Sequence, residues 1–177
     1  MPVLPFDGVE PKVAPDAWIA PDSWIIGQVD LGSQCSSFFG TVVRGDILPV
    51  RVGDGTNLQE HALLHTSTGL SAVIVGKNVT VGHHAILHGC TVQDNCIIGM
   101  GSTILDGAVI EENCVIGANS LVSMNTRIPA GHLAFGSPAR PVRKLTPKEI
   151  EGIRESARHY RELGEKYRAS FGSGLAK

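Results

Sequence analysis

Aliphatic residues recur at every sixth position through most of the chain. Written in sixes from Val13, the sequence reads VAPDAW, IAPDSW, IIGQVD, LGSQCS, SFFGTV and VRGDIL, and the phase restarts at Val52 and at Val75. Of nineteen such hexads, eighteen begin with Val, Ile or Leu, and only Ser37 breaks the rule. The fifth place is nearly always small or β-branched. A six-residue unit of this kind predicts a short strand followed by a turn.

Hexapeptide repeats are typical of a parallel β-helix, in which stacked coils supply the core that no single unit could bury. Three hexads make one coil, and coils stack at the spacing of neighbouring strands, about 4.8 Å. Nineteen hexads therefore predict an all-β solenoid of about six triangular coils. Two insertions interrupt it, one of three residues before Val52 and one at the "TSTGL" segment.

A helix is expected after the repeats, in the stretch "LTPKEIEGIRESARHYRELGEKY". Thr146 is placed to be its N-cap, with Pro147 at the first helical position and Glu149 completing a capping box. An apolar stripe at helical spacing predicts packing on the prism or on a neighbouring subunit. The expected organisation is a lead-in over 1–12, a β-helix over 13–142, and a C-terminal helix and tail over 143–177.

Composition narrows the function classes. A formal charge of −2 and a pI near 6.4 give no electrostatic footprint for nucleic acid. No apolar run approaches the roughly 18 residues of a membrane span, and "MPVLPFDG" does not read as a leader. The four cysteines show no C-x-x-C spacing. We expect a cytoplasmic protein that binds neither nucleic acid nor membranes.

The candidate chemistry lies in the histidines, of which "VTVGHHAILHGC" holds three. His65 and His88 are each second in their hexads, three hexads apart once the inserted loop is excluded, so they are predicted to share a corner on successive coils. Arg44 stands one coil earlier in the same column. His83 lies most of a hexad away, and its ring is expected to reach the corner of an adjacent subunit. His84 is expected to point outward at a turn.

Two imidazoles one coil apart can bind a single ion at about 2.0–2.1 Å, and catalytic zinc takes three protein ligands. His65, His83 and His88 are therefore the candidate ligands. The alternative is that the histidines only form hydrogen bonds at an interface. Cys90, two residues after His88, is an alternative fourth ligand, whereas the other cysteines are expected in the core.

Five segments together resemble the γ-class carbonic anhydrase family, in particular its short bacterial branch: "VVRGD", "NLQEHALLH", "VTVGHHAILHGC", "IIGMGSTILDGA" and "AFGSPARPVRKLT". The resemblance implies a left-handed β-helix, because handedness does not follow from the repeat itself. It also implies a homotrimer with zinc at each subunit interface, Fe²⁺ or Co²⁺ being the alternatives. His65 and His88 would come from one subunit and His83 from its neighbour.

Further site residues follow from the same resemblance. Gln59 matches a glutamine near the metal-bound water, and Asn57 matches a polar neighbour of the site. Arg44 and Asp46 match an arginine and an aspartate of the interface. Glu60 stands where an aspartate is usual, which implies an Arg44–Glu60 pair across subunits.

The implied activity is reversible hydration of CO₂ to bicarbonate by metal-bound hydroxide. One departure concerns proton export: the family archetype has a glutamate after the Arg-x-Asp motif and an acidic loop after the first ligand. Here these are Ile47 and the uncharged "TSTGLSA". Tyr160 on the C-terminal helix is expected either over the site or in an aromatic packing contact.

Two other functions stay open at this point. The first is acyl chemistry, as a thioester hydrolase or a hexapeptide acyltransferase. Three histidines placed as ligands exceed the single general base that a transferase needs. The second is a metal-binding trimer with little activity.

Overall fold

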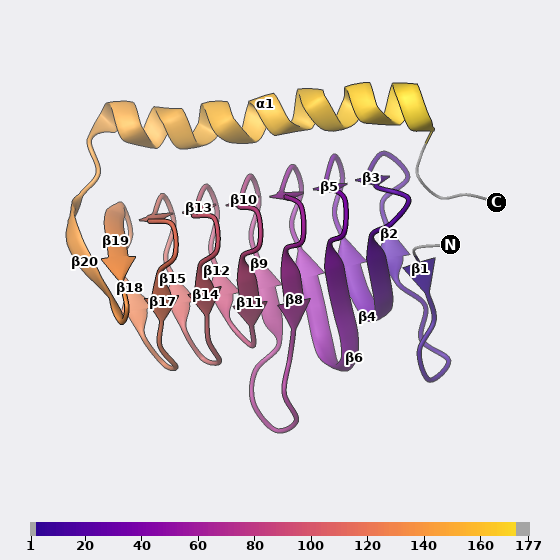
Figure 1. The fold of residues 1–177 in the computed structure, drawn as a ribbon, viewed down its shortest axis with the longest axis horizontal. Helices are drawn as coiled ribbons and strands as arrows, with labels where there is room; N and C mark the ends of the chain where they lie inside the picture. Colours follow the sequence, from indigo (N-terminus) through magenta and orange to yellow (C-terminus); the bar gives the residue numbers. More distant parts are fainter. Residues whose placement is uncertain (1–2, 173–177) are drawn as a thin grey trace.

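The computed structural model describes residues 3–172, which form a parallel β-solenoid with one helix, α1, along its length (Figure 1). The predicted fold class is confirmed, but the solenoid has about seven turns rather than about six. The extra turn arises because strand β1 (Val3–Leu4), which no hexad marks, pairs in parallel with β4 (Trp24–Leu31) and completes a coil with β2 (Lys12–Val13), where the first hexad begins.

The coils have three faces. Short strands make up most of each face, and the long strands β4 (Trp24–Leu31) and β6 (Val42–Val52) pass from the first face to the second. The first face also holds β1 (Val3–Leu4), β8 (Leu63–His65), β11 (Ile86–His88), β14 (Thr103–Ile104) and β17 (Leu121–Val122). The second face also holds β2 (Lys12–Val13), β9 (Val73–Val75), β12 (Thr91–Val92), β15 (Val109–Ile110) and β18 (Arg127–Ile128). The third face holds β3 (Trp18–Ile19), β5 (Ser36–Ser37), β7 (Asn57–Leu58), β10 (Thr80–Val81), β13 (Ile97–Ile98), β16 (Val115–Ile116), β19 (His132–Gly136) and β20 (Ala139–Lys144).

The core is the stack of aliphatic side chains that begin the hexads. Ile98 pairs with Ile116 on the next coil, eighteen residues later, and both are fully buried. The thiols of Cys35, Cys96 and Cys114 are buried among these residues, as expected. Strands of the first two faces such as β14 and β15 alternate a half-buried and a buried residue, so one side chain faces outward and the next fills the prism. In β3, β5, β7 and β10, on the face that α1 covers, both residues are buried.

Both insertions lie at the edge between the first and second faces. Gly27 of β4 pairs with Gly45 of β6, whereas Val29 pairs with Val50, so residues 46–49 bulge from the edge. Three extra residues were expected just before Val52, and the structure places them at this corner. The second insertion is the loop between β8 and β9, which extends away from the prism at the same edge (Figure 1).

Helix α1 (Pro147–Phe171) covers the third face. The predicted N-terminus is confirmed, since Thr146 accepts a hydrogen bond from the Glu149 N–H and the Glu149 side chain accepts one from the Thr146 N–H. The helix packs on the prism of its own chain, where the ring of Tyr167 stacks on Trp18 with a centroid distance of 4.6 Å. Among residues 3–172, no helix has both the length and the apolar character needed to cross a membrane.

The alternation within β15 gives a test of this packing. Ile110→Ala removes a fully buried side chain, so we expect the free energy of unfolding to fall by about 2–5 kcal/mol. Val109→Ala, at the half-buried neighbour on the same strand, should cost less than about 1 kcal/mol. Urea denaturation of both variants measures the difference, and equal losses would contradict this assignment of inward and outward faces.

Candidate metal centre

His65 and His88 lie side by side at the end of the first face. They are register partners at the C-terminal ends of β8 and β11, next to the fully buried Leu64 and Leu87. Because successive residues of a strand point to opposite sides, burial of the leucines turns both imidazoles outward. Their ring centroids are 5.4 Å apart at an interplanar angle of 63°. Two rings on adjacent coils are thus brought together by strand register alone.

Each of these rings uses one nitrogen to contact a carboxylate. The Nε2 atom of His65 lies 3.1 Å from Oδ1 of Asp46, and Nδ1 of His88 lies 2.8 Å from Oδ2 of Asp106. Within residues 3–172, the other ring nitrogen of each histidine makes no hydrogen bond. A histidine held by a carboxylate at one nitrogen while the other is left free is the usual arrangement of a metal ligand.

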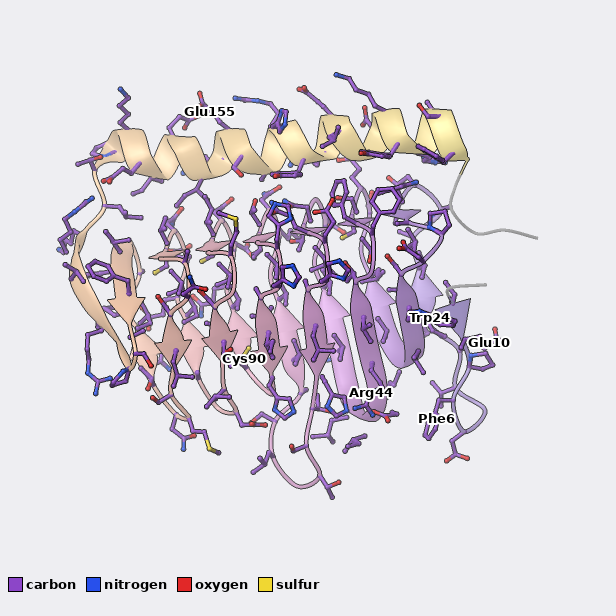
Figure 2. All side chains as sticks on the ribbon, in the orientation of Figure 1. Phe6, Glu10, Trp24, Arg44, Cys90 and Glu155 are labelled. Carbon is purple, nitrogen blue, oxygen red and sulfur yellow. The ribbon has the colours of Figure 1, made fainter. Side chains whose placement is uncertain are left out.

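Asp46 connects this pair to Arg44. The guanidinium of Arg44 donates to Asp46 within the same chain, and both belong to the corner of β6. Burial alone would raise the pKa of Asp46, but the hydrogen bonds from Arg44 and His65 outweigh it and hold the pKa below its usual range. Asp46 is therefore an anionic acceptor for both neighbours. In Figure 2, Arg44 lies at the lower edge of the prism, on the side away from α1.

His83 lies at a different edge, at the turn that joins the third face to the first. Its Nδ1 atom is 2.6 Å from Oε2 of Glu60, one coil earlier, and about two fifths of its side chain is exposed. Within residues 3–172, no three His, Cys, Asp or Glu residues converge closely enough to hold a metal ion. Glu60 pairs with His83 here and Arg44 with Asp46. The Arg44–Glu60 pair across subunits stays a prediction.

His84 pairs with a histidine that is not a candidate ligand. It has a φ of 58° at an exposed turn, and its ring stacks on His61, which has a φ of 61° one coil earlier. The two ring centroids are 4.9 Å apart. His84 and His61 thus form a second pair of histidines in the same part of the prism.

Gln59 and Asn57 form a buried amide pair at the end of β7. The Asn57 side chain donates to Thr80 Oγ1 at 3.0 Å, and the Gln59 amide donates to Asn57 Oδ1 at 3.4 Å. Asn57 is 1% exposed and Gln59 is 5% exposed. Asn57 therefore restrains the Gln59 side chain, whose oxygen makes no hydrogen bond within the described residues.

Tyr160 makes the expected aromatic packing contact, and its place over the site stays a prediction. Its ring packs edge-to-face on Phe38, with centroids 5.8 Å apart. Burial first, and the charge of nearby Glu60 second, raise the pKa of the Tyr160 hydroxyl. The phenol therefore lies in the aromatic cluster under α1 and near the carboxylate that contacts His83.

Cys90 lies in the core. It is 1% exposed, and burial together with the charge of Asp106 raises the pKa of its thiol to about 12. The thiolate form that binds metal is therefore strongly disfavoured at neutral pH. This position does not suit a fourth ligand.

The bulge and the loop next to His65 expose aliphatic side chains. Ile47 on the corner bulge is 41% exposed, and Leu70 on the β8–β9 loop is 51% exposed. The Leu48 N–H donates to Thr66 Oγ1 at 3.1 Å, which ties the bulge to the loop. Neither segment places a carboxylate there beyond Asp46.

Sequence reasoning missed Asp106, which contacts His88. The available signal was its spacing: this coil has seventeen residues, so Asp106, third in its hexad, stands one position beyond the residue that follows His88 by one coil. A search for metal-binding residue types in the column of His65 and His88 does not find Asp106, because the next residue in that column is Leu105.

The donor chemistry of the three histidines fits zinc. Two imidazoles with a free nitrogen each come from one edge of a chain, and a third imidazole, His83, stands at another edge with its Nε2 unbonded within the described residues. Nitrogen ligands of this type suit zinc, copper, iron and nickel. Each chain thus presents two such imidazoles at one edge and a third at another.

Comparison with known proteins supports the family resemblance seen in the sequence. The family model for bacterial transferase hexapeptide repeats matches residues 89–123. The chain is 45% identical over 160 residues to gamma carbonic anhydrase 2, mitochondrial, of Arabidopsis thaliana, covering 88% of this chain and 58% of that protein. It is 42% identical to a carbonic anhydrase of Geobacillus kaustophilus, covering 94% and 91%. The chain thus spans less than two thirds of the plant relative.

A solved structure gives the same architecture. A Bacillus cereus protein, described only provisionally as an acetyltransferase, is 42% identical to this chain and superposes with a TM-score of 0.92. The match covers 94% of this chain and 96% of that one. Similarity therefore extends over nearly the whole prism and the helix.

Substitution of single histidines tests the geometry. We expect His65→Ala and His88→Ala each to lose the zinc that wild-type protein binds at about one ion per chain, because a two-ligand site holds zinc weakly. His84→Ala should keep the metal, since its ring stacks on His61 instead. Elemental analysis of the dialysed proteins measures this, and zinc loss from the His84 variant equal to that from the His88 variant would contradict the assignment.

Proposed function

The chain belongs to the γ-class carbonic anhydrase family, and from this premise we propose that it is a zinc-dependent enzyme that hydrates CO₂ reversibly to bicarbonate. The observation that carries the proposal is the register of His65 with His88, each with one nitrogen held by a carboxylate and the other unbonded within residues 3–172. When bound, zinc lowers the pKa of a water ligand to near 7 and so supplies a nucleophile at neutral pH.

A homotrimer is part of this proposal. The outward side chains of the first face form an aliphatic column that includes Val42, Leu63 and Ile86, all half-buried in the single chain. Helix α1 covers the third face and leaves this one open. A cyclic arrangement sets the first face of one subunit against an edge of the next, which would bring the neighbour's copy of His83 toward His65 and His88.

The remaining residues have roles in orientation and in the subunit contact. Gln59, restrained by Asn57, offers an amide oxygen and amide hydrogens for orienting the attacking water and CO₂. Arg44 and Asp46 hold His65 at the corner, and Glu60 holds His83. Tyr160, a neighbour of Glu60, lies on the third-face side of the edge that holds His83. Fe²⁺ and Co²⁺ have the same preference for imidazole ligands and remain alternatives.

Proton export has no charged relay beyond Asp46 on the bulge and the loop next to His65. Ile47 and Leu70 are exposed where the family archetype has acidic groups. The proton released by each hydration would therefore pass to a buffer molecule from solution. The cytoplasmic location expected from the sequence stays a prediction.

A second candidate function is acyl chemistry. The observation in its favour is the 42% identity to the Bacillus cereus protein, together with the exposed aliphatic side chains of Ile47 and Leu70, which suit an acyl chain. A zinc ion held by the same histidines would supply an activated water suited to a thioester carbonyl as well as to CO₂. A metal-dependent hydrolase and a metal-free transferase are then separated by the effect of a chelator.

Stopped-flow CO₂ hydration tests the function. We expect zinc-loaded wild-type protein to accelerate hydration, with a rate that rises with imidazole buffer concentration because solution buffer accepts the proton. His65→Ala should lose the activity, and Ile47→Glu should reduce the dependence on buffer. No activity with any of zinc, Fe²⁺ or Co²⁺, alongside chelator-sensitive hydrolysis of an acyl thioester, would replace this proposal by the second candidate.

Mixing of variant subunits tests whether two chains share the site. His83→Ala and His88→Ala are each expected to lack metal alone. After denaturation and joint refolding of equal amounts, about a quarter of the interfaces of a random cyclic trimer combine intact partners, so about a quarter of the zinc and activity should return.

The matched control is a mixture of His65→Ala with His88→Ala. Both substitutions damage the same edge, so no combination of these subunits restores a site. Equal recovery in the two mixtures, or none in the first, would contradict a ligand contributed by a neighbouring subunit.

A further inference from the structure

Asp106 is a buried carboxylate whose two oxygens have different surroundings. The residue is 8% exposed, and its Oδ2 atom lies 2.8 Å from Nδ1 of His88. Its Oδ1 atom is also buried and has no hydrogen-bond partner among residues 3–172. A buried carboxyl oxygen without a hydrogen-bond donor costs free energy. A residue that only stabilised the prism would not be expected to keep this cost.

Two other aspartates show what the same hexad position does elsewhere. Asp54 and Asp94 are also third in their hexads, at the edge between the second and third faces. Oδ1 of Asp54 accepts the Ser33 N–H at 3.0 Å, and Oδ1 of Asp94 accepts the Lys77 N–H at 2.8 Å. Each carboxylate thus caps the backbone of the coil beneath it, directly after a glycine.

Asp106 lies against a glycine in the same way but lacks this donor. A Cβ on Gly89 would collide with Oδ1 of Asp106, as one on Gly76 would collide with Oδ1 of Asp94. Gly89, however, has a φ of +53°, in the left-handed region, whereas Gly76 does not. The peptide after Gly89 is therefore turned differently, and the Cys90 N–H does not bond to Asp106. The carboxylate contacts a histidine ring instead.

We infer that Asp106 is a positioning residue: its carboxylate fixes His88 in the tautomer protonated at Nδ1 and leaves Nε2 as the lone-pair donor to a metal. The inference rests on the proposed function for the metal itself, but the tautomer is a property of the metal-free chain. A carboxylate that accepts Nδ1–H also raises the basicity of the opposite nitrogen. Gly89 belongs to this device, because only glycine leaves room for the carboxylate beneath the turn.

Asp106→Asn tests the inference while keeping the size of the side chain. We expect the dissociation constant for zinc, measured by competition with a chromogenic chelator, to rise 10–100-fold. Asp94→Asn is the matched control, since it removes a carboxylate from the same hexad place with no histidine beside it. Its zinc affinity should equal that of the wild type. The free energy of unfolding of all three metal-free proteins is measured by urea denaturation after treatment with a chelator. This measurement separates a loss of stability from a loss of zinc affinity.

A spectroscopic measurement separates the failure of this inference from the failure of the proposed function. In metal-free wild-type protein at pH 8, the ¹⁵N shifts of His88 should report protonation at Nδ1, and Asp106→Asn should populate the tautomer protonated at Nε2. A His88 ring protonated at Nε2 in the wild type would overturn the inference, and so would zinc affinities that agree within about threefold. If wild-type protein binds no zinc, the proposed function fails, and the tautomer still decides the role of Asp106.

Discussion

Register between parallel coils is the constraint on which the rest of this molecule depends. Aliphatic side chains such as Ile98 and Ile116 stack in the interior, and backbone hydrogen bonds join each coil to the next. A slip of one residue would turn the buried set outward, so burial fixes the register strongly. The positions of the outward residues follow from the same register without any further stabilising interaction. His65 and His88 therefore face the same way at one strand spacing, although 23 residues separate them.

The candidate site lies where the period is interrupted. The bulge at 46–49 and the loop after His65 occur at one edge, and Leu48 and Thr66 link them by a hydrogen bond. A regular prism offers only a flat column of side chains at each corner. The extra residues place Asp46 against Nε2 of His65 and expose Ile47 beside it. Regular coils thus fix the spacing of the imidazoles, while the irregular segments set what surrounds them.

Much of this was predictable because the repeat converts sequence spacing into position. The hexad phase gave the parallel solenoid, the shared corner of His65 and His88, and the exposed turn of His84. The capping box at Thr146 was local and equally readable. The seventh turn was not, since β1 carries no hexad and forms by pairing with β4. Asp106 was not predicted for another reason. Its role depends on the backbone turn at Gly89, and the sequence alone does not show that the Cys90 N–H is directed away from the Asp106 carboxylate.

The geometry of the prism also explains why a site of three imidazoles needs more than one chain. His83 lies at the turn before the first face, and His88 lies at the far end of β11 on that face, so the two rings stand at opposite edges of it. Neither ring can leave its edge, because the fully buried Ala85 and Leu87 between them hold the first face in register. Under the proposed function, metal binding and subunit association are therefore linked. Zinc that binds only the assembled form stabilises that form by mass action, and dilution or chelation acts on both equilibria together.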